Sequence, residues 1–323
     1  MEQNQIITVM GSPGAGKTTT SIKLALELAG GKKNVVLVFC DPFTPVVPFV
    51  VPCPQEQVSI GELLTAPSLT QKMILDACIP IKDSGYISLL GYRSGESLMA
   101  YPQITRERAV DFMVCLRYLA DYIIMDCSAI YEADVLSMVA MELSDQFIKL
   151  GTSNLRGISY FEPRRMFLSD QRFQPERQLF YLGNVRDGQE WEAVSEQYGG
   201  VNGALPYVAG LEVQYDELAL FEPLAGKESA AYLEEIRKLS ERLSGSREGA
   251  KTEERTGRFW RTGTEKKTEE KRDLENGPVK LVSDSSEVKI GWKASRKGQP
   301  NKKAKQDENR KGFSLFGHKR GEF

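Results

Sequence analysis

A glycine-rich octapeptide near the start of the chain constrains the fold most. Residues 11–18 read GSPGAGKT. They follow a β-branched apolar run at residues 6–10 and precede residues 18–29, whose apolar side chains recur at helical spacing. A strand, a glycine-rich turn and a helix in this order are typical of an α/β domain with a parallel sheet.

The octapeptide matches GxxxxGK[ST], the pattern of a phosphate-binding loop, and the flanking strand and helix are the required context. Its glycines let backbone N–H groups turn toward phosphate oxygens at the positive end of a helix. Lys17 is expected to reach the β and γ phosphates, and the Thr18 hydroxyl to ligate Mg²⁺. The predicted nucleotide-binding residues are Gly11, Ser12, Pro13, Gly14, Ala15, Gly16, Lys17, Thr18 and Thr19. A chance match is the alternative.

Two aspartates follow apolar runs that read as buried strands. Asp126 ends the run at residues 122–125, as in a Walker B element whose aspartate holds Mg²⁺ through water. Asp41 follows residues 35–39 and would position the attacking water or the metal shell; its alternative role is to cap the next turn. Lys17, Asp41 and Asp126 are the candidate catalytic residues, with Thr18 and Asp126 at the metal.

The rest of the first 244 residues repeats the strand–helix alternation. Strands are expected at 35–39, 86–90, 122–125, 146–150, 179–182 and 204–208, and helices at 107–119, 135–143 and 229–243. This order predicts an α/β fold with a doubly wound, mostly parallel sheet and flanking helices. Residues 42–54 contain five prolines, which predicts an apolar loop after a strand: a switch or contact loop, or a packed surface loop.

The net charge of −2 hides two unlike parts. Residues 1–244 carry 21 Lys and Arg against 31 Asp and Glu, a charge of −10, whereas residues 245–323 carry 21 against 13, a charge of +8. Only 16 of the last 79 residues are apolar, too few to offset the entropy of ordering. We therefore predict a nucleotide-binding domain at 1–244 and a disordered basic tail at 245–323.

Composition excludes several other classes. The chain has one histidine and five cysteines without CxxC spacing, which argues against multi-histidine metal sites and favours reduced thiols. It lacks an apolar run of ~18 residues, and MEQNQ lacks the basic and apolar regions of a signal peptide. A cytoplasmic location is expected.

On these residues, the chain resembles the MinD/ParA branch of P-loop ATPases (SIMIBI class), including TadZ-like pilus-assembly proteins, over residues 5–243. The segments 35–41 and 121–126 are similar to the family's first switch and Walker B strand. The resemblance implies that Asn184 contacts adenine and that Pro206 lies in the turn along the base. It also implies Mg·ATP, a nucleotide-dependent homodimer, slow hydrolysis, and a role in spatial positioning or assembly with a partner of a pilus, conjugation or partition system.

Two departures stand out. The family's signature lysine, which reaches the partner's phosphates in the dimer, would fall at position 12, which is Ser12. After Asp126 the family has a small residue, proline and glycine, whereas this chain has residues 127–130 reading CSAI. The resemblance thus leaves two enzymatic outcomes open: slow hydrolysis, or a nucleotide-bound adaptor with negligible turnover.

A second resemblance is to the signal-recognition-particle GTPases and their flagellar relative, through residues 14–20 followed by Lys23-Leu24-Ala25. Guanine selection in that family needs a Thr-Lys-x-Asp strand end, and the corresponding residues 183–187 read GNVRD. The chain also starts its first strand near residue 5, without the family's N-terminal helical bundle. We therefore favour ATP over GTP.

The tail's last segment, residues 311–320, places Phe313, Leu315 and Phe316 among basic residues. It resembles the amphipathic targeting segment of MinD and predicts weak contact with an anionic membrane surface, which dimerisation would strengthen. Contact with DNA phosphates is an alternative use of the same charge. A solvated or partner-binding linker is a third.

Overall fold

The structure, a computed structural model, describes residues 4–51, 57–82 and 84–257, with side chains as far as residue 245. The chain divides into two units, residues 1–263 and 264–323, and only the first contains described residues. Residues 245–257 of the predicted disordered tail belong to a helix that begins at Ala230, whereas the rest of that tail, with the amphipathic segment at 311–320, lies outside the described residues. The boundary at residue 244 stays a prediction.

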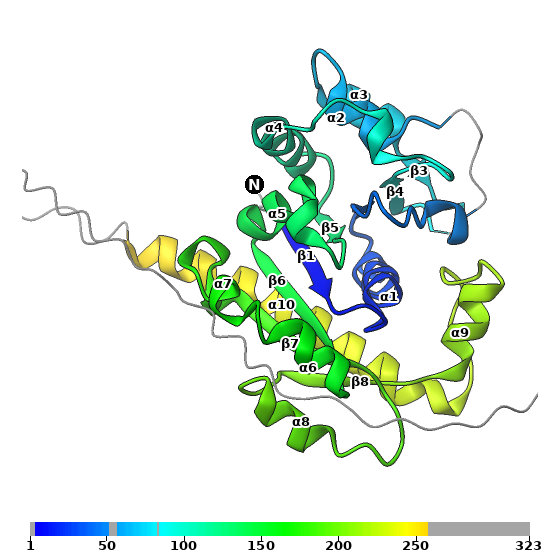
Figure 1. Cartoon of the computed structure of the whole chain (residues 1–323), viewed down its shortest axis with the longest axis vertical. Coiled ribbons are helices and arrows are strands. Elements are labelled where there is room, and N and C mark those ends of the chain that lie inside the picture. Colours follow the sequence, from blue (N-terminus) through cyan, green and yellow to red (C-terminus); the bar gives the residue numbers. More distant parts are fainter. Residues whose placement is uncertain (1–3, 52–56, 83, 258–323) are drawn as a thin grey trace, which may run out of the picture. The chain divides into compact units, whose positions relative to one another are not determined.

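An eight-stranded sheet forms the centre of the first unit (Figure 1). Its spatial order is β3 (Ile79–Pro80), β4 (Ile87–Gly91), β2 (Val35–Phe39), β5 (Tyr122–Asp126), β1 (Gln5–Gly11), β6 (Gln146–Thr152), β7 (Gln178–Val185) and β8 (Gly203–Pro206). Every pairing is parallel except that of the short edge strand β3 with β4. The doubly wound, mostly parallel sheet predicted from the alternation is confirmed.

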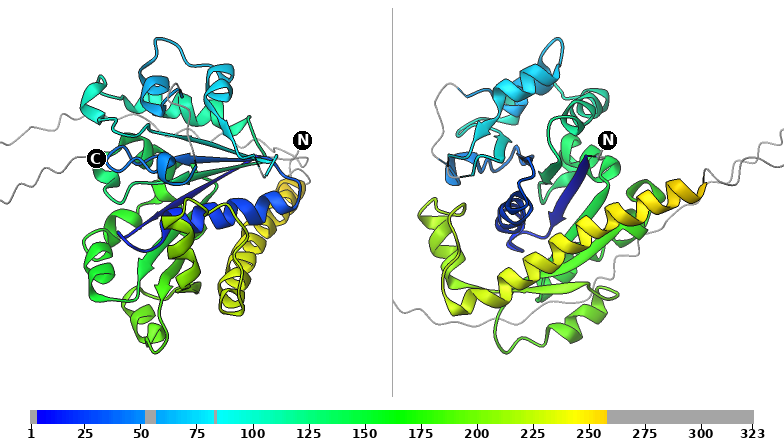
Figure 2. Two further views of the ribbon diagram at one scale, coloured as in Figure 1. Left: turned by 90° about the vertical axis from the view of Figure 1, so that its right-hand side faces the viewer. Right: turned by 180° about the vertical axis from the view of Figure 1, so that it is seen from behind.

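Both faces of the sheet are covered, because alternate residues of the buried strands point to opposite sides. On one face, Ile7 and Val9 of β1 pack with the apolar residues of α1 (Lys17–Gly30) and α10 (Ala230–Gly257). On the other, Ile6 and Met10 pack with α4 (Arg106–Arg117) and α5 (Val135–Leu143). Figure 2 shows α10, in yellow, running along α1 and β8.

The strand register brings three strand ends to one edge. In β5, Asp126 pairs with Val9 of β1 on one side and with Phe39 of β2 on the other. The residues that follow these strands therefore emerge side by side at the carboxyl edge of the sheet. The phosphate loop, Asp41 and Asp126 meet there, at the position where ligands bind in open α/β sheets.

Several short elements are absent from the sequence prediction. They are α2 (Ile60–Thr65), α3 (Gln71–Ala77), α6 (Leu155–Phe161), α7 (Arg165–Leu168), α8 (Trp191–Gln197), α9 (Ala209–Asp216), the strand β3 and six 3₁₀ turns. One of these turns, Val47–Phe49, lies inside the predicted proline-rich loop, of which residues 52–56 are outside the described part. In α10, Leu233 is 40% exposed, while Tyr232 and Ile236 are buried.

Candidate nucleotide-binding site

The predicted phosphate loop connects β1 to α1 as a tight backbone turn. Gly14 and Gly16 have φ values of 75° and 81°, in the left-handed region that favours glycine. Thr20 N donates to Gly16 O at 2.8 Å, and Ser12 N donates to Leu150 O of β6 at 3.0 Å. The loop therefore begins anchored to a neighbouring strand and ends at the positive end of a 14-residue helix.

A neighbouring strand touches the loop closely. An added Cβ at Gly183, in β7, would lie 2.0 Å from Ala15 O, so no larger residue fits there without a shift. Asn184 follows with a positive φ of 54°, and its Nδ2 donates to Gly14 O at 2.7 Å. The residue that the resemblance assigned to adenine is thus placed against the phosphate loop, next to Gly16.

Thr18 and Asp126 lie in direct contact. Thr18 Oγ1 donates to Asp126 Oδ2 at 2.7 Å, and Ser21 Oγ donates to Oδ1 at 3.2 Å. Burial raises the pKa of Asp126 to about 6, against the opposing effects of the Thr18 hydrogen bond and the nearby Lys17 ammonium. The carboxylate that sequence reasoning placed at a metal is therefore buried beside the hydroxyl placed at the same metal.

This donor set suits Mg²⁺ bound together with phosphates. Within the described ranges, no three His, Cys, Asp or Glu side chains gather as they would to hold a metal by themselves. One hydroxyl and one carboxylate are what Mg²⁺ commonly takes from a protein when substrate phosphates and water complete its shell. Thr18 and Asp126 are the residues that would hold the ion.

Lys17 begins α1 and is partly buried at the same edge. Burial lowers its pKa, while the charges of Asp126 and Asp41 act in the opposite direction. Among the described residues the Lys17 ammonium has no hydrogen bond or ion pair. A desolvated cation held in this way is available for an anionic ligand.

Asp41 caps the turn that follows β2. Its Oδ1 accepts from Phe43 N at 2.9 Å and from Thr44 N at 3.2 Å, and its Oδ2 accepts from Thr44 Oγ1 at 2.9 Å. Both oxygens are engaged, as the alternative reading of this residue expects. Asp41 also lines a cavity with Lys17 and Asp126, so its role toward water stays a prediction.

Two cavities adjoin the loop. One, of about 430 Å³, lies on the phosphate side and is lined by Lys17, Thr18, Phe39, Asp41, Thr44, Pro45, Val46, Phe49, Ser94, Gly95, Asp126, Cys127 and Tyr215. The other, of about 260 Å³, is lined by Ala15, Gly16, Thr19, Thr20, Gly183, Asn184, Leu205, Tyr207, Val208, Leu211, Glu212, Tyr215, Asp216 and Tyr232. Tyr215 belongs to both linings, so the two cavities adjoin each other.

The second cavity has a mixed lining of aromatic, backbone and acidic groups. Pro206 ends β8, and the following Tyr207 donates from its hydroxyl to Glu212 Oε2 at 2.8 Å. The Arg186 guanidinium lies 4.1 Å from the centre of the Tyr207 ring. Backbone, an aromatic ring and acidic groups of α9 thus surround this space, although Pro206 itself is not among its lining residues.

Helix α9 lines the second cavity, and sequence reasoning missed it. It supplies Leu211, Glu212, Tyr215 and Asp216 to the second cavity. Lys23 of α1 holds α9 and the segment that follows it: its Nζ donates to Gln214 Oε1 at 2.8 Å, Leu220 O at 2.6 Å and Glu222 O at 3.0 Å. A lysine inside an otherwise apolar helix pattern was the available signal.

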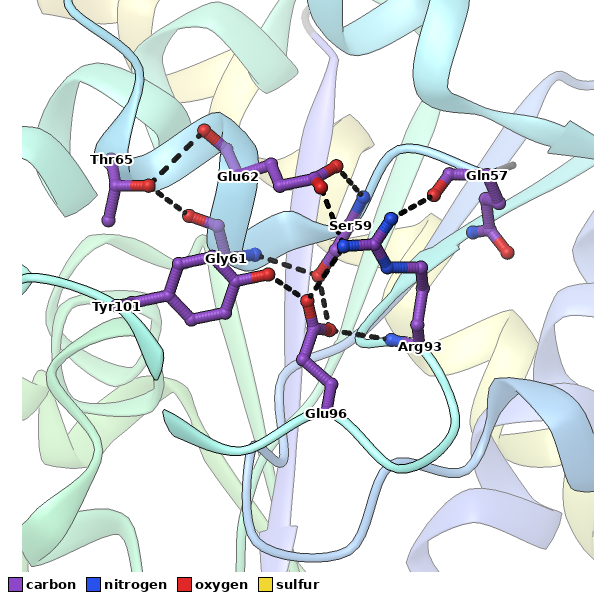
Figure 3. A network of polar contacts seen from close by, with 8 residues as sticks. All are labelled: Gln57, Ser59, Gly61, Glu62, Thr65, Arg93, Glu96 and Tyr101. Carbon is purple, nitrogen blue, oxygen red and sulfur yellow. Dashed lines mark hydrogen bonds and ion pairs between the residues drawn. The ribbon is translucent and has the colours of Figure 1, made fainter. Parts of the chain in front are cut away.

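A polar network positions another wall of the phosphate-side cavity. Ser94 and Gly95 lie on a loop after β4, and Figure 3 shows the contacts that fix this loop. Glu96 accepts from Ser59 Oγ at 2.5 Å, from Arg93 N at 2.7 Å and from the Tyr101 hydroxyl. Arg93 also pairs with Glu62 at 2.6 Å. The loop is therefore tied to the start of α2.

The structure describes both places where the sequence departs from the family pattern, Ser12 and residues 127–130. Ser12 is fully buried, and among the described residues its Oγ has no hydrogen-bond partner. After Asp126, Ser128 N donates to Ser137 Oγ at 3.0 Å, and Ile130 N donates to Ser128 Oγ at 3.1 Å. This segment is pinned to the start of α5, where the family's glycine would allow freer backbone movement.

The fold is shared with solved structures of nucleotide-binding proteins. A ParA family ATPase from Chlorobium tepidum TLS superposes with a TM-score of 0.61 at 14% identity, covering 74% of this chain and 98% of that protein. The chain has the fold of the ParA/MinD ATPases. MinD from Pyrococcus horikoshii OT3, complexed with Mg-ADP, gives 0.58 at 18% identity over 76% and 98% of the two chains.

An ATP complex of an McdA variant from Cyanothece gives a TM-score of 0.54 at 13% identity, covering 74% of this chain and 96% of McdA. No protein-family model and no curated protein matches the sequence. At these identities the likeness establishes the fold. Among the described residues, no helix combines the length and apolar character needed to cross a bilayer.

Proposed function

We propose that this chain is a MinD/ParA-like protein that binds Mg·ATP in the two adjoining cavities and hydrolyses it slowly. The observation that carries the proposal is the meeting of Lys17, Thr18 and Asp126 at one end of a site whose other end is lined by Asn184 and α9. The ATP and Mg-ADP complexes of proteins with this fold support it.

The residues would divide the work as follows. Backbone N–H groups of residues 11–18 and the Lys17 ammonium would neutralise phosphate charge. Mg²⁺ supplies further charge stabilisation when it is bound by Thr18, with Asp126 acting through water. Asp41 would orient the attacking water through the acceptor site that its turn leaves free, because a carboxylate has about four such sites and the turn uses three.

The cellular role that we propose is spatial positioning or assembly, by a nucleotide-dependent homodimer with a protein partner of a pilus, conjugation or partition system. We place it in the cytoplasm, with peripheral contact at the inner face of the membrane through residues 311–320. DNA contact by the basic tail is the competing use. Equal sedimentation of the full chain and a tail-deleted chain with anionic vesicles in ATP would exclude the membrane contact.

Affinity measurements test the nucleotide assignment. With Mg²⁺ present, we expect ATP to bind more tightly than GTP to the full chain. Replacing Lys17 by Ala should weaken ATP binding by roughly 10- to 100-fold, because a charge-assisted contact to phosphate is lost. GTP binding as tight as that of ATP would instead favour the signal-recognition type of GTPase.

A second candidate is a nucleotide-bound adaptor without useful turnover. The buried Ser12 in place of the signature lysine favours it. Turnover of the wild type, Lys17→Ala and Ser12→Lys separates the two. Because position 12 is fully buried, Ser12→Ala and a melting curve are the matched controls for Ser12→Lys. The same background rate in all variants assigns the adaptor role.

A further inference from the structure

A third cavity, of about 210 Å³, lies away from the nucleotide-binding site. Its lining residues come from β6, β7, the end of α6, α7 and the segments around residues 175 and 198: Lys149, Phe161, Arg165, Leu168, Ser169, Pro175, Gln178, Phe180 and Tyr198. It shares no residue with either nucleotide cavity. The lining contains two cations and no carboxylate.

The floor of this cavity is a cluster of three aromatic rings. Phe180 lies 4.8 Å from Phe161 and 4.6 Å from Tyr198, centre to centre, and Phe161 lies 5.7 Å from Tyr198. Edge-to-face contacts of this kind fix ring orientations. The Tyr198 hydroxyl donates to Thr152 O at 2.9 Å, which holds its ring against β6. The floor is rigid and apolar.

Lys149 is placed over this floor by the sheet itself. It pairs with Phe180 in the parallel register of β6 and β7, and its Nζ lies 5.0 Å from the centre of the Phe180 ring. Among the described residues it makes no hydrogen bond or ion pair. Burial lowers the pKa of Lys149, and no neighbouring carboxylate opposes the shift.

The polar side chains around Lys149 donate their hydrogen bonds to backbone carbonyls. Arg165 Nη2 donates to Gln197 O at 2.8 Å, Ser169 Oγ donates to Met166 O at 2.8 Å, and Gln178 Nε2 donates to Leu168 O at 2.8 Å. A half-buried cation without an acceptor is costly to keep. In this molecule Lys17 shares that condition, and Lys17 faces a predicted phosphate site.

We propose that this third cavity binds a small aromatic carboxylate, with its carboxylate on Lys149 and its ring on the Phe161, Phe180 and Tyr198 cluster. Arg165, at the exposed rim, adds a second positive charge. The volume is below the ~300–1,000 Å³ of sites for drug-sized ligands, so the molecule is of about one ring. The site is separate from the proposed nucleotide function.

Ligand-observed NMR titration of the full chain tests this site with three probes: benzoate, benzyl alcohol and inorganic phosphate. We expect benzoate to bind with a Kd on the order of 0.1–1 mM, and the other two at least about tenfold more weakly. Phosphate binding equal to that of benzoate would make this a plain anion site and overturn the proposal. Absence of benzoate binding would overturn it too.

The benzoate affinities of lysine variants show which cavity the probe occupies. Lys149→Met, which keeps the length and packing of the side chain, should raise the Kd of benzoate by about tenfold or more, whereas Lys227→Met, at an exposed position, should leave it unchanged. Lys17→Ala, the variant expected to weaken ATP binding, should still bind benzoate. Loss in Lys17→Ala instead of Lys149→Met would place benzoate in the nucleotide-binding site and refute the third cavity.

Discussion

Lys23 and Lys149 are both shielded from solvent, but their ammonium groups have different surroundings. On α1, Lys23 is 4% exposed, and its ammonium donates to one side-chain amide and two backbone carbonyls. Lys149 on β6 faces an aromatic ring and has no acceptor among the described residues. Burial lowers the pKa of both, that of Lys23 to about 8. The difference separates a cation used for structure from one available to a ligand.

The phosphate-loop lysine belongs with Lys149 in this comparison. Asp126 and Asp41 lie near enough to Lys17 to favour its charge, yet neither accepts a hydrogen bond from it. Lys23, only six residues along the same helix, is saturated. Two lysines close together on one helix can therefore have different roles, and the acceptors around each ammonium indicate which role it has.

The largest stability effect is expected at Lys23. Replacement by Met leaves the Leu220 carbonyl and the Gln214 side-chain oxygen without the Lys23 donor, whereas the Glu222 carbonyl keeps the bond from Gln214 Nε2 at 3.3 Å. Each orphaned group costs ~1–3 kcal/mol. We expect the free energy of unfolding to fall by about 2–4 kcal/mol in urea denaturation, and ATP affinity to fall because α9 loses its anchor. An unchanged midpoint in urea would break the distinction between the two lysines.

The loss of stability in Lys23→Met should depend on pH in a defined direction. The folded-state pKa of about 8 lies below the usual 10.5, so between these values the unfolded chain binds more protons. Stability due to Lys23 therefore rises with pH across this interval. The gap between the wild type and Lys23→Met should widen from pH 8 to pH 10, while Lys227→Met shows no such change.

The sequence was sufficient to predict the sheet and the meeting of Thr18 with Asp126 at its carboxyl edge. Buried parallel strands are continuous apolar runs, and Gly14, Gly16 and Lys17 form a pattern that serves one local geometry. The position of Asp126 followed from its place after a strand, because neighbouring parallel strands end at one edge. These are local signals that tertiary packing did not override.

The base end could not be predicted in the same way. Helix α9 is eight residues long and buries only Leu211, so it has too few apolar positions to show a period. Its place against the cavity depends on Lys23, whose acceptors lie about 190 residues away in the sequence. The Lys149 cavity likewise requires the β6–β7 register, which no sequence pattern specifies.

Replacing Asp126 should change the free energy of unfolding by an amount between the effects expected at Lys23 and at Lys149. Asp126 accepts from two hydroxyls, and its folded-state pKa of about 6 lies above the usual 3.8. The folded chain therefore binds more protons between these values, and stability due to Asp126 is lost as pH rises from 3.8 to 6. Asp126→Asn should be more stable than the wild type by ~1–3 kcal/mol at pH 7.5 without nucleotide.

The effect of Mg²⁺ on ATP affinity is a separate test of Asp126. In the wild type, Mg²⁺ should strengthen ATP binding above pH 6 and do so less as the Asp126 carboxylate is protonated below it. In Asp126→Asn the contribution of Mg²⁺ should be small at every pH. Calorimetric titration of ATP with and without Mg²⁺ at pH 5.5 and 7.5 measures both. Equal Mg²⁺ dependence in the two proteins would remove Asp126 from the metal.

The smallest change in the free energy of unfolding is expected for Lys149→Met. Its sign tests whether Lys149 and Lys23 differ in the way described above. Lys149→Met removes a desolvated charge that has no acceptor and replaces it with a flexible apolar side chain over Phe180. The free energy of unfolding should therefore rise by about 0.5–1 kcal/mol, opposite in sign to Lys23→Met. Urea denaturation of the two variants and of Lys227→Met under one condition makes the comparison direct. A loss of stability at Lys149 would mean that the ammonium is held by the protein itself, and that the cavity beside it has no unsatisfied charge to offer a ligand.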